Sequence, residues 1–127
     1  PAYSRDNSND NFSCKKDVDI GDIQMVTAKM LIVFGAYMEF ARIRGLPVEI
    51  TNIKEKLPSS MSDTHPQGRA IDTSVKEWSE QDIKECEKHL NNKYRTYATG
   101  PAGKEKRVAV YHDIGYGPHF HLQVRRD

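Results

Sequence analysis

Two short histidine motifs, about fifty residues apart, contain the side chains best suited to chemistry. The first is the HPQGRAID segment from His65 to Asp72, and the second is His119-Phe-His121. A catalytic zinc ion commonly takes three protein ligands from imidazole and carboxylate groups and keeps a fourth position for water. Together the motifs supply two imidazoles and one carboxylate for such an ion, with one further imidazole for acid-base work.

The alternation of side chains along a strand tests whether these groups can meet. Residues 119–125 read as a strand, and its apolar face consists of Phe120, Leu122 and Val124. His119, His121 and Gln123 therefore point to the opposite face. In the predicted strand 69–75, Asp72 also points away from the face that carries the more apolar side chains. If the two strands are neighbours, Asp72 and both histidines share a face that aliphatic side chains do not fill.

The requirements of zinc assign His65, Asp72 and His121 as the three metal ligands. Gly68 lets the chain turn between the first two ligands, and the small side chain of Ala70 leaves room beside the metal. The sequence thus predicts an open zinc site with a position for water.

His119 is the candidate general base, since it lies two positions before a ligand on the same face. His112 is a rival for the third ligand position, although it falls at the end of its strand. His89 lies among charged residues and is expected to be exposed to solvent. A single His-x-His on an edge strand is more often surface histidine, so the metal hypothesis depends on both motifs occurring together.

Hydrophobic periodicity and β-branched content predict the order of elements. We expect helices at 22–44 and 79–94 and strands at 48–53, 69–75, 107–111 and 119–125. Ser79 and Asp82 form a capping box at the start of the second helix. This order predicts an α+β fold with a four-stranded antiparallel sheet backed by helices. Residues 1–18 are expected to form an irregular N-terminal arm, and residues 19–127 a single domain.

Composition narrows the range of partners. The chain has 19 basic and 18 acidic residues without a dense basic stripe, so we expect no nucleic-acid partner. The longest apolar run, 30–34, is too short for a membrane span, so we expect no membrane partner. We also expect a monomer. Without a visible signal peptide, we expect either cytoplasmic synthesis with holin-type or other release, or a leader already processed. Cys14 and Cys86 favour two thiols over a disulfide.

The pattern His65-x-x-Gly-x-Ala-x-Asp72, followed by His119-Phe-His121-Leu, resembles the zinc peptidoglycan peptidases of the D-Ala-D-Ala carboxypeptidase and LAS group. This group also includes bacteriophage endolysins and the Hedgehog signalling domain. The resemblance covers about residues 20–126. It implies a Hedgehog/DD-peptidase-like fold with one zinc ion. It also implies hydrolysis of an amide bond in bacterial cell-wall peptides, by an endopeptidase or by a D,D- or L,D-carboxypeptidase.

Two departures from the family pattern bear on the reaction. Asp63 stands where many members have Ser, and Pro118 stands where many have a catalytic Glu. Members of the group with His-x-His use the earlier histidine instead, which suits His119. The alternative hypothesis is a non-catalytic, zinc-stabilised binding domain of the same fold, and a third is a domain without metal.

Cations near the motifs are candidates for binding the substrate carboxylate or the developing oxyanion. Family members tend to carry an Arg after the strand that precedes the first ligand, and here the nearest cations are Lys54 and Lys56. Arg69, inside the first motif, is a third candidate. The two lysines are also consistent with an ordinary solvated surface.

Overall fold

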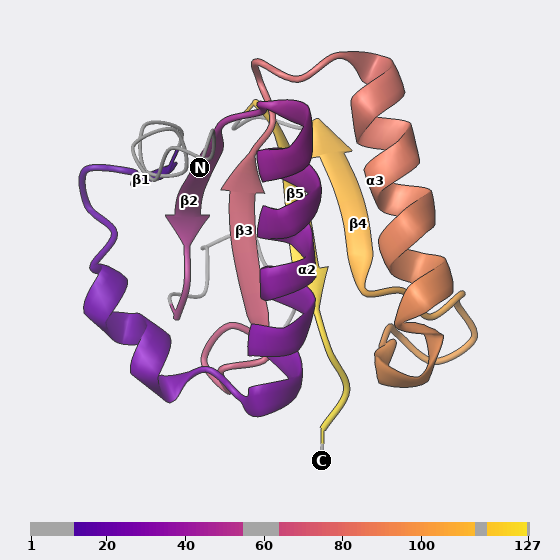
Figure 1. Ribbon diagram of the computed structural model, residues 1–127. Coiled ribbons are helices and arrows are strands. Elements are labelled where there is room, and N and C mark those ends of the chain that lie inside the picture. The colour runs from indigo at the N-terminus through magenta and orange to yellow at the C-terminus, as the bar shows by residue number, and fades with distance from the viewer. Residues whose placement is uncertain (1–11, 55–63, 114–116, 127) are drawn as a thin grey trace, which may run out of the picture.

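A five-stranded sheet with helices on one face forms the framework of the protein (Figure 1). The computed structural model describes residues 12–54, 64–113 and 117–126. The strands are β1 (Phe12–Cys14), β2 (Val48–Asn52), β3 (Ala70–Ser74), β4 (Ala109–Asp113) and β5 (Pro118–Gln123). The α-helices are α2 (Ala28–Arg44) and α3 (Glu80–Lys93), and the 3-10 helices are η1 (Ile20–Met25) and η2 (Arg95–Tyr97). The order of strands across the sheet is β1-β2-β3-β5-β4.

The α+β class is confirmed, but the prediction of four antiparallel strands is wrong. The sheet is mixed, because β1 pairs in parallel with β2, with Phe12 opposite Val48. The other pairings, β2 with β3, β3 with β5 and β5 with β4, are antiparallel. A strand of three residues is too short to show alternation, and it lies in the segment expected to be an irregular arm.

The first predicted helix is interrupted near its start. Val26 has extended backbone angles, and Thr27 caps α2 by accepting a hydrogen bond from the amide of Met30. The interruption makes room for the loop before β3. Gly68 lies so close to Met25 that a Cβ atom would be 2.3 Å from the Met25 carbonyl oxygen. The amide of Thr27 donates to the carbonyl of Gly68 at 2.9 Å, so a contact distant in sequence sets the helix boundary.

The second helix begins as predicted. The Ser79 side chain accepts a hydrogen bond from the Asp82 amide, as a capping residue does. The third predicted strand is displaced, however. β4 begins at Ala109, and Arg107 instead makes an isolated bridge to Thr99. This bridge closes the loop between η2 and β4.

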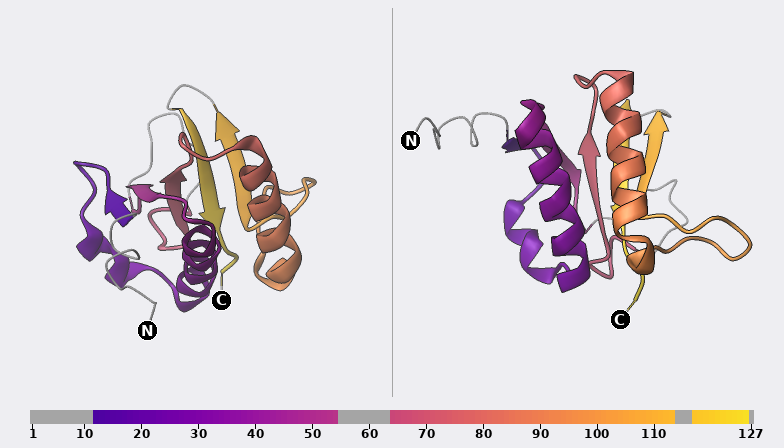
Figure 2. Two further views of the ribbon diagram at one scale, coloured as in Figure 1. Left: turned by 45° about the horizontal axis from the view of Figure 1, so that its top comes forward. Right: turned by 45° about the vertical axis from the view of Figure 1, so that its right-hand side comes forward.

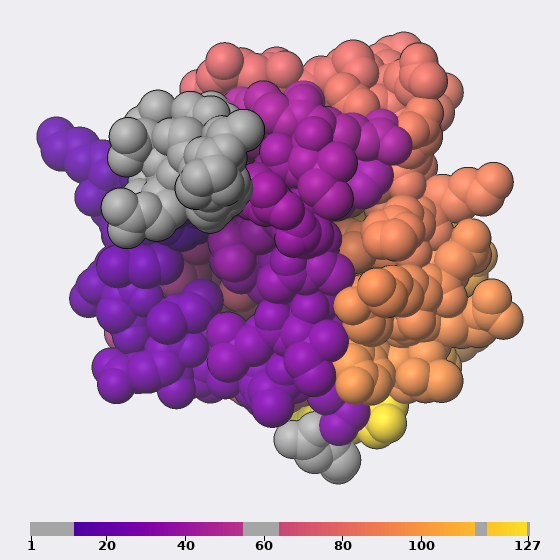
Figure 3. Space-filling view, in the orientation of Figure 1, coloured from indigo at the N-terminus to yellow at the C-terminus, as the bar shows by residue number. Residues whose placement is uncertain are grey.

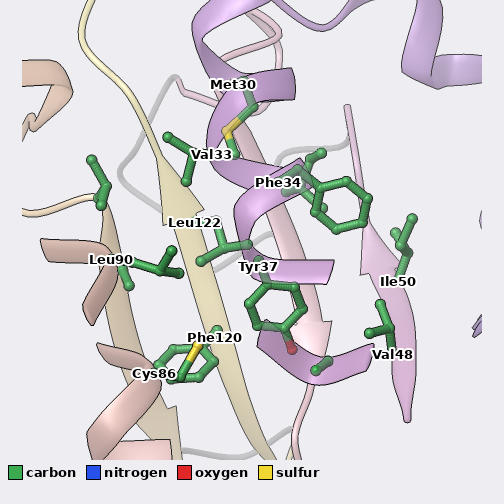
Figure 4. Packing of buried hydrophobic residues seen from close by; sticks show 14 of the residues in the cluster. Met30, Val33, Phe34, Tyr37, Val48, Ile50, Cys86, Leu90, Phe120 and Leu122 are labelled. Atoms are coloured by element: carbon green, nitrogen blue, oxygen red, sulfur yellow. The ribbon is translucent and has the colours of Figure 1, made fainter. Parts of the chain in front are cut away.

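The helices bury an aromatic core against the sheet, shown in Figure 4. The ring of Tyr37 stacks on Trp78 with centroids 5.4 Å apart, and Phe120 meets Tyr37 edge-on at 6.0 Å. The hydroxyl of Thr73 donates to the Tyr37 hydroxyl at 2.8 Å. Burial raises the pKa of Cys86 to about 12, so this thiol is protonated at neutral pH. Cys86 and Cys14 are both free thiols, as favoured from the sequence.

The strand register divides the sheet into two chemically different faces. Thr73 is opposite Phe120 on the face covered by the helices. Asp72 is opposite His121 on the other face, and Ser74 is opposite His119. Figures 2 and 3 show α2 and α3 lying together over the covered face. In the described ranges, no helix has the length and apolar character needed to cross a membrane.

Candidate metal centre

Asp72 and His121 meet directly across two central strands. They are register partners on β3 and β5, and the distance from His121 Nδ1 to Asp72 Oδ1 is 2.8 Å. This pairing fulfils the condition set from the sequence, namely that the two strands be neighbours. Asp72 is 4% exposed, so its carboxylate needs partners within the protein.

His65 reaches the same carboxylate from the turn that precedes β3. The turn is closed by hydrogen bonds from the amide of Gly68 to the carbonyl of His65 and from the amide of Arg69 to the carbonyl of Thr64. Gly68 has a φ of 71°, a backbone conformation that residues other than glycine rarely adopt, and this supports its predicted role in the turn. The Nε2 atom of His65 consequently lies 3.2 Å from Asp72 Oδ2.

Hydrogen bonds on the outer side of both rings determine which nitrogen of each ring faces the carboxylate. Nδ1 of His65 donates to the carbonyl of Ile53 at 2.9 Å, because a carbonyl can only accept. Nε2 of His65 is therefore available to a metal. Outer hydrogen bonds of this kind orient metal-binding histidines and fix their tautomers.

Gln123 performs the corresponding task for His121. Its side-chain amide donates to the carbonyls of Thr99 and Arg107, at 3.0 and 3.1 Å. These two acceptors fix the orientation of the amide, so its oxygen must accept from Nε2 of His121 at 3.0 Å. Nδ1 of His121 is therefore the atom left to bind a metal.

The charges in this group are strongly coupled. Burial alone would raise the pKa of Asp72, but hydrogen bonds and charge from His121 and His65 outweigh it and hold that pKa well below its usual range. Burial alone would lower the pKa of His65, but its hydrogen bond to Asp72 and the carboxylate charge raise it overall. An anionic carboxylate between two imidazoles is an environment that attracts cations.

Together, His65, Asp72 and His121 form a group that could hold a metal ion. One ligand atom from each residue lies within 4.8 Å of the others. Two imidazoles on one tetrahedral ion, with metal–nitrogen bonds of about 2.0–2.1 Å, place their ring centres about 5.2 Å apart. The rings of His65 and His121 are 5.1 Å apart, so the observed spacing fits a shared ion.

His119 lies on the same sheet face but outside this group of three. Its Nδ1 donates to the carbonyl of Gly117 at 3.0 Å, which leaves the lone pair on Nε2. A neutral imidazole with a free Nε2 can accept a proton, as expected for the residue predicted to be a general base.

The other histidines are also placed by the structure. His112, the rival for the third ligand, is the register partner of His119 on β4 and does not join the metal group. Burial and the positive charges of His119 and His121 lower its pKa. His89 is exposed on α3, as predicted, and stacks on Phe40.

The cations expected to bind substrate have different surroundings. Lys54 is about half exposed and forms an ion pair with Asp22 at 3.6 Å. Arg69 is buried, and its guanidinium donates to the carbonyl of Val124 at 2.7 Å and to the side chain of Gln67 at 2.8 Å. These bonds connect the turn before β3 with the end of β5, which gives Arg69 a structural task. Lys56 lies outside the described residues, as does Asp63.

Two contributors to the site were not recognised from the sequence. Alternation placed Gln123 on the correct face, and its position two residues after His121 was the available signal. Its role depends on the carbonyls of Thr99 and Arg107, which belong to a distant loop. The carbonyl of Ile53 gave no signal at all, because every residue has a backbone carbonyl.

Comparisons with protein-family models, with curated proteins and with solved structures find no significant match. The described residues show two imidazoles and one carboxylate that could hold a metal ion, with a third imidazole on the same face.

Proposed function

We propose that this protein is a zinc-dependent peptidase that hydrolyses an amide bond in bacterial cell-wall peptides. The observation that carries the proposal is the arrangement of His65, Asp72 and His121, whose ligand atoms converge while outer hydrogen bonds orient the imidazoles. Two imidazoles, one carboxylate and no thiolate form a donor set typical of catalytic rather than structural zinc.

The chemistry of zinc supports an amide hydrolase. When bound to three protein ligands, a zinc ion polarises a carbonyl group and supplies a water molecule whose pKa is near 7. The protein itself must then move protons at Nε2 of His119. This nitrogen accepts a proton from the attacking water and later donates it to the leaving amine. The carbonyl of Gly117, which accepts from Nδ1 at 3.0 Å, stabilises the positive charge of the ring between these steps.

The substrate class comes from the motif resemblance. The two motifs, with His119 and His121 in the second, are similar to those of the peptidoglycan peptidases, including endolysins and carboxypeptidases. We infer a peptide of the bacterial cell wall as the substrate and a monomeric enzyme. Both endopeptidase and carboxypeptidase activity are compatible with the donor set, because the choice depends on how the peptide is seated.

Digestion of purified peptidoglycan tests the proposal. The protein is loaded with one equivalent of zinc, and the soluble fragments are identified by mass spectrometry. We expect new amine and carboxyl ends at one type of peptide bond, loss of activity with a chelator and recovery when zinc is restored. Intact cross-links and stem peptides after long incubation with the zinc-loaded protein would contradict the proposal, whereas the cleaved bond distinguishes an endopeptidase from a carboxypeptidase.

A pair of histidine variants tests the role of His119. His119→Ala should abolish hydrolysis while zinc content stays near one equivalent, because this ring is outside the metal group. His89→Ala is the matched control, since His89 is exposed on α3, and it should hydrolyse at the wild-type rate. The wild-type rate should also fall at acidic pH, because a protonated imidazole cannot accept a proton. Loss of bound zinc in His119→Ala would show that the roles are wrongly assigned.

A second candidate function is a zinc-stabilised binding domain without catalysis. Pro118 favours it, because this residue occupies the position at which many relatives have a catalytic Glu. In such a domain, zinc would connect the His65 turn to the sheet, and its removal would lower the melting temperature. A stabilised protein that leaves every cell-wall peptide intact would favour this candidate.

A further inference from the structure

A second pair of histidines lies beside the metal group on the same face of the sheet. His112 on β4 and His119 on β5 are register partners, and their ring centroids are 5.4 Å apart. His112 is also near His121, with ring centroids 6.3 Å apart. The three rings therefore continue the polar face from the central strands to the edge strand β4.

The spacing of this pair resembles that of the metal group. The rings of His65 and His121 are 5.1 Å apart, and those of His112 and His119 are 5.4 Å apart. Both values are close to the separation of about 5.2 Å for two imidazoles on one tetrahedral ion. Register partners on antiparallel strands also have closely spaced Cβ atoms, so the pair is held by the sheet itself.

Each ring of this pair has a nitrogen without a hydrogen-bond partner among the described residues. Nε2 of His119 carries the lone pair, because Nδ1 donates to the carbonyl of Gly117. Within residues 12–54, 64–113 and 117–126, the ring of His112 has no hydrogen-bond partner. His112 is only about half-buried, so part of its side chain is exposed among the described residues.

We propose that His112 and His119 form a second, weaker binding site for a divalent transition metal ion such as Zn²⁺. Imidazole suits zinc, copper and nickel, and two such ligands without a carboxylate bind less tightly than the adjacent group of three. An ion at this site takes the Nε2 lone pair of His119, which is the atom that accepts the proton in the proposed reaction. Because His119 can then no longer accept a proton, excess metal inhibits hydrolysis; this inhibition rests on the proposed function.

Equilibrium dialysis against increasing concentrations of Zn²⁺ alone tests the binding site without any assay of activity. We expect the wild-type protein to bind one equivalent tightly and a second at higher free zinc. His112→Ala and His112→Gln should bind one equivalent, and His89→Ala, which removes an exposed histidine elsewhere, should bind two. Saturation of the wild type at one equivalent, or loss of the second equivalent in His89→Ala, would overturn the site.

A ligand variant of the tight site separates the two proposals. The double variant with His65→Ala and Asp72→Asn removes two of the three ligands of the first group but leaves His112 and His119 in place, so it should retain the weak equivalent and lose the tight one. Survival of the weak equivalent alone would support the second site even if the proposed peptidase activity proved wrong. Its disappearance together with the tight one, in a variant with a native circular dichroism spectrum, would overturn an independent second site.

Hydrolysis at stoichiometric and at excess zinc tests the inhibition. In the wild type, the rate at stoichiometric zinc should exceed the rate at excess zinc by about tenfold or more, because the second ion blocks His119. Catalytic proton transfer by a side chain contributes roughly 100-fold or more to the rate, so its loss is large enough to give this effect. In His112→Ala the ratio of the two rates should approach one. If excess zinc lowers the rate of His112→Ala as much as that of the wild type, the inhibiting ion binds elsewhere. If no protein hydrolyses peptidoglycan, the proposed function fails, and dialysis still decides the site.

Discussion

The two faces of strand β5 differ in chemistry although they are built from alternating residues of one short segment. The residues that face the helices are Phe120, Leu122 and Val124, all fully buried. Those that face away are His119, His121 and Gln123. The contrast shows how a period of two separates the groups that stabilise the fold from the groups that perform chemistry.

The covered face is stabilised by apolar packing. Tyr37, Trp78 and Phe120 pack with ring centroids between 5.4 and 6.1 Å apart, and α2 and α3 exclude solvent from them. The hydroxyl of Tyr37 accepts from Thr73, so this polar group is satisfied inside the core. Changes on this face should therefore be measured mainly as changes in the free energy of unfolding.

The face of the sheet that bears Asp72 and His121 is stabilised by hydrogen bonds and ion pairs. Among the described residues, no buried side-chain nitrogen or oxygen lacks a hydrogen-bond partner. Asp72 is almost completely buried, but His65 and His121 compensate its charge. Gln123 and the carbonyl of Ile53 hold the two rings from behind. Changes on this face should therefore be measured mainly as changes in metal affinity.

Phe120→Ala should cause the largest effect, because it leaves a cavity beside the stacked rings of Tyr37 and Trp78. We expect the free energy of unfolding of the metal-free protein to fall by about 3–5 kcal/mol, measured by urea denaturation with a chelator present. His119→Ala, one residue earlier on the opposite face, is the matched control and should cost less than about 0.5 kcal/mol. Equal losses for the two variants would contradict the separation of the faces.

Asp72→Asn should lower the affinity for zinc, because it changes the face of the sheet that bears the metal group. The amide keeps the size of the side chain but removes the charge that His65 and His121 share. Removing an outer-shell partner typically costs 10–100-fold in affinity, so loss of a direct ligand should weaken zinc binding by more than about 100-fold. Competition with a fluorescent zinc chelator gives the affinity, and circular dichroism should show the wild-type fold. Wild-type affinity in this variant would exclude Asp72 as a ligand.

Gln123→Ala should produce a smaller loss of affinity, because Gln123 orients His121 without binding the metal. We expect about a 10–100-fold weaker affinity for zinc, from the same competition assay. Gln123→Glu keeps an acceptor for Nε2 of His121 but loses the donation to the carbonyls of Thr99 and Arg107, so it should recover only part of the affinity. If both variants bind zinc as the wild type does, the orientation of His121 must have another origin.

The pH dependence of the metal-free protein should show the smallest effect. Burial lowers the pKa of His65, but Asp72 outweighs burial and raises this pKa overall. The stabilising contribution of His65 is therefore complete below about pH 6.5 and is lost as pH rises through the folded-state pKa. Asp72, whose pKa is depressed, contributes above about pH 3.9 and loses this as pH falls further. The melting temperature without metal should therefore decrease between pH 6 and pH 8.5.

The zinc-loaded protein provides the control for this pH series. Zinc binding displaces the proton from its ligand His65, so the affinity for zinc and the stabilisation by zinc should increase over the same range of pH. Parallel melting curves with zinc and with a chelator, recorded by scanning calorimetry, measure both slopes. A metal-free melting temperature that rises toward pH 8.5 would contradict the hydrogen bond assigned between His65 and Asp72.

The sequence predicted the features that local alternation determines. Strand periodicity placed Asp72, His119 and His121 on one face, and the structure confirms their register. The turn at Gly68 was also predicted, since a positive φ favours glycine. The α+β class followed from the order of elements, whereas the family of the fold stays a prediction.

Features that depend on distant contacts could not be predicted. The break before α2 arises because the carbonyl of Gly68 binds the amide of Thr27, and no local pattern contains that contact. Strand β1 forms by parallel pairing with β2, although η1 and α2 separate the two strands in the sequence. The hydrogen bonds of Arg69 to Val124 and Gln67 likewise connect the turn before β3 with the end of β5, a contact that no local pattern contains, and its binding of substrate stays a prediction.

X-ray absorption at the zinc edge of the protein loaded with one equivalent identifies the atoms bound to the metal. We expect nitrogen and oxygen neighbours at about 2.0–2.2 Å with the multiple scattering of two imidazoles, and no sulfur neighbour. In Asp72→Asn and in His121→Ala, loaded under the same conditions, this spectrum should be lost. A sulfur shell at about 2.3 Å, or an unchanged spectrum in both variants, would contradict the assignment of His65, Asp72 and His121 as the metal centre.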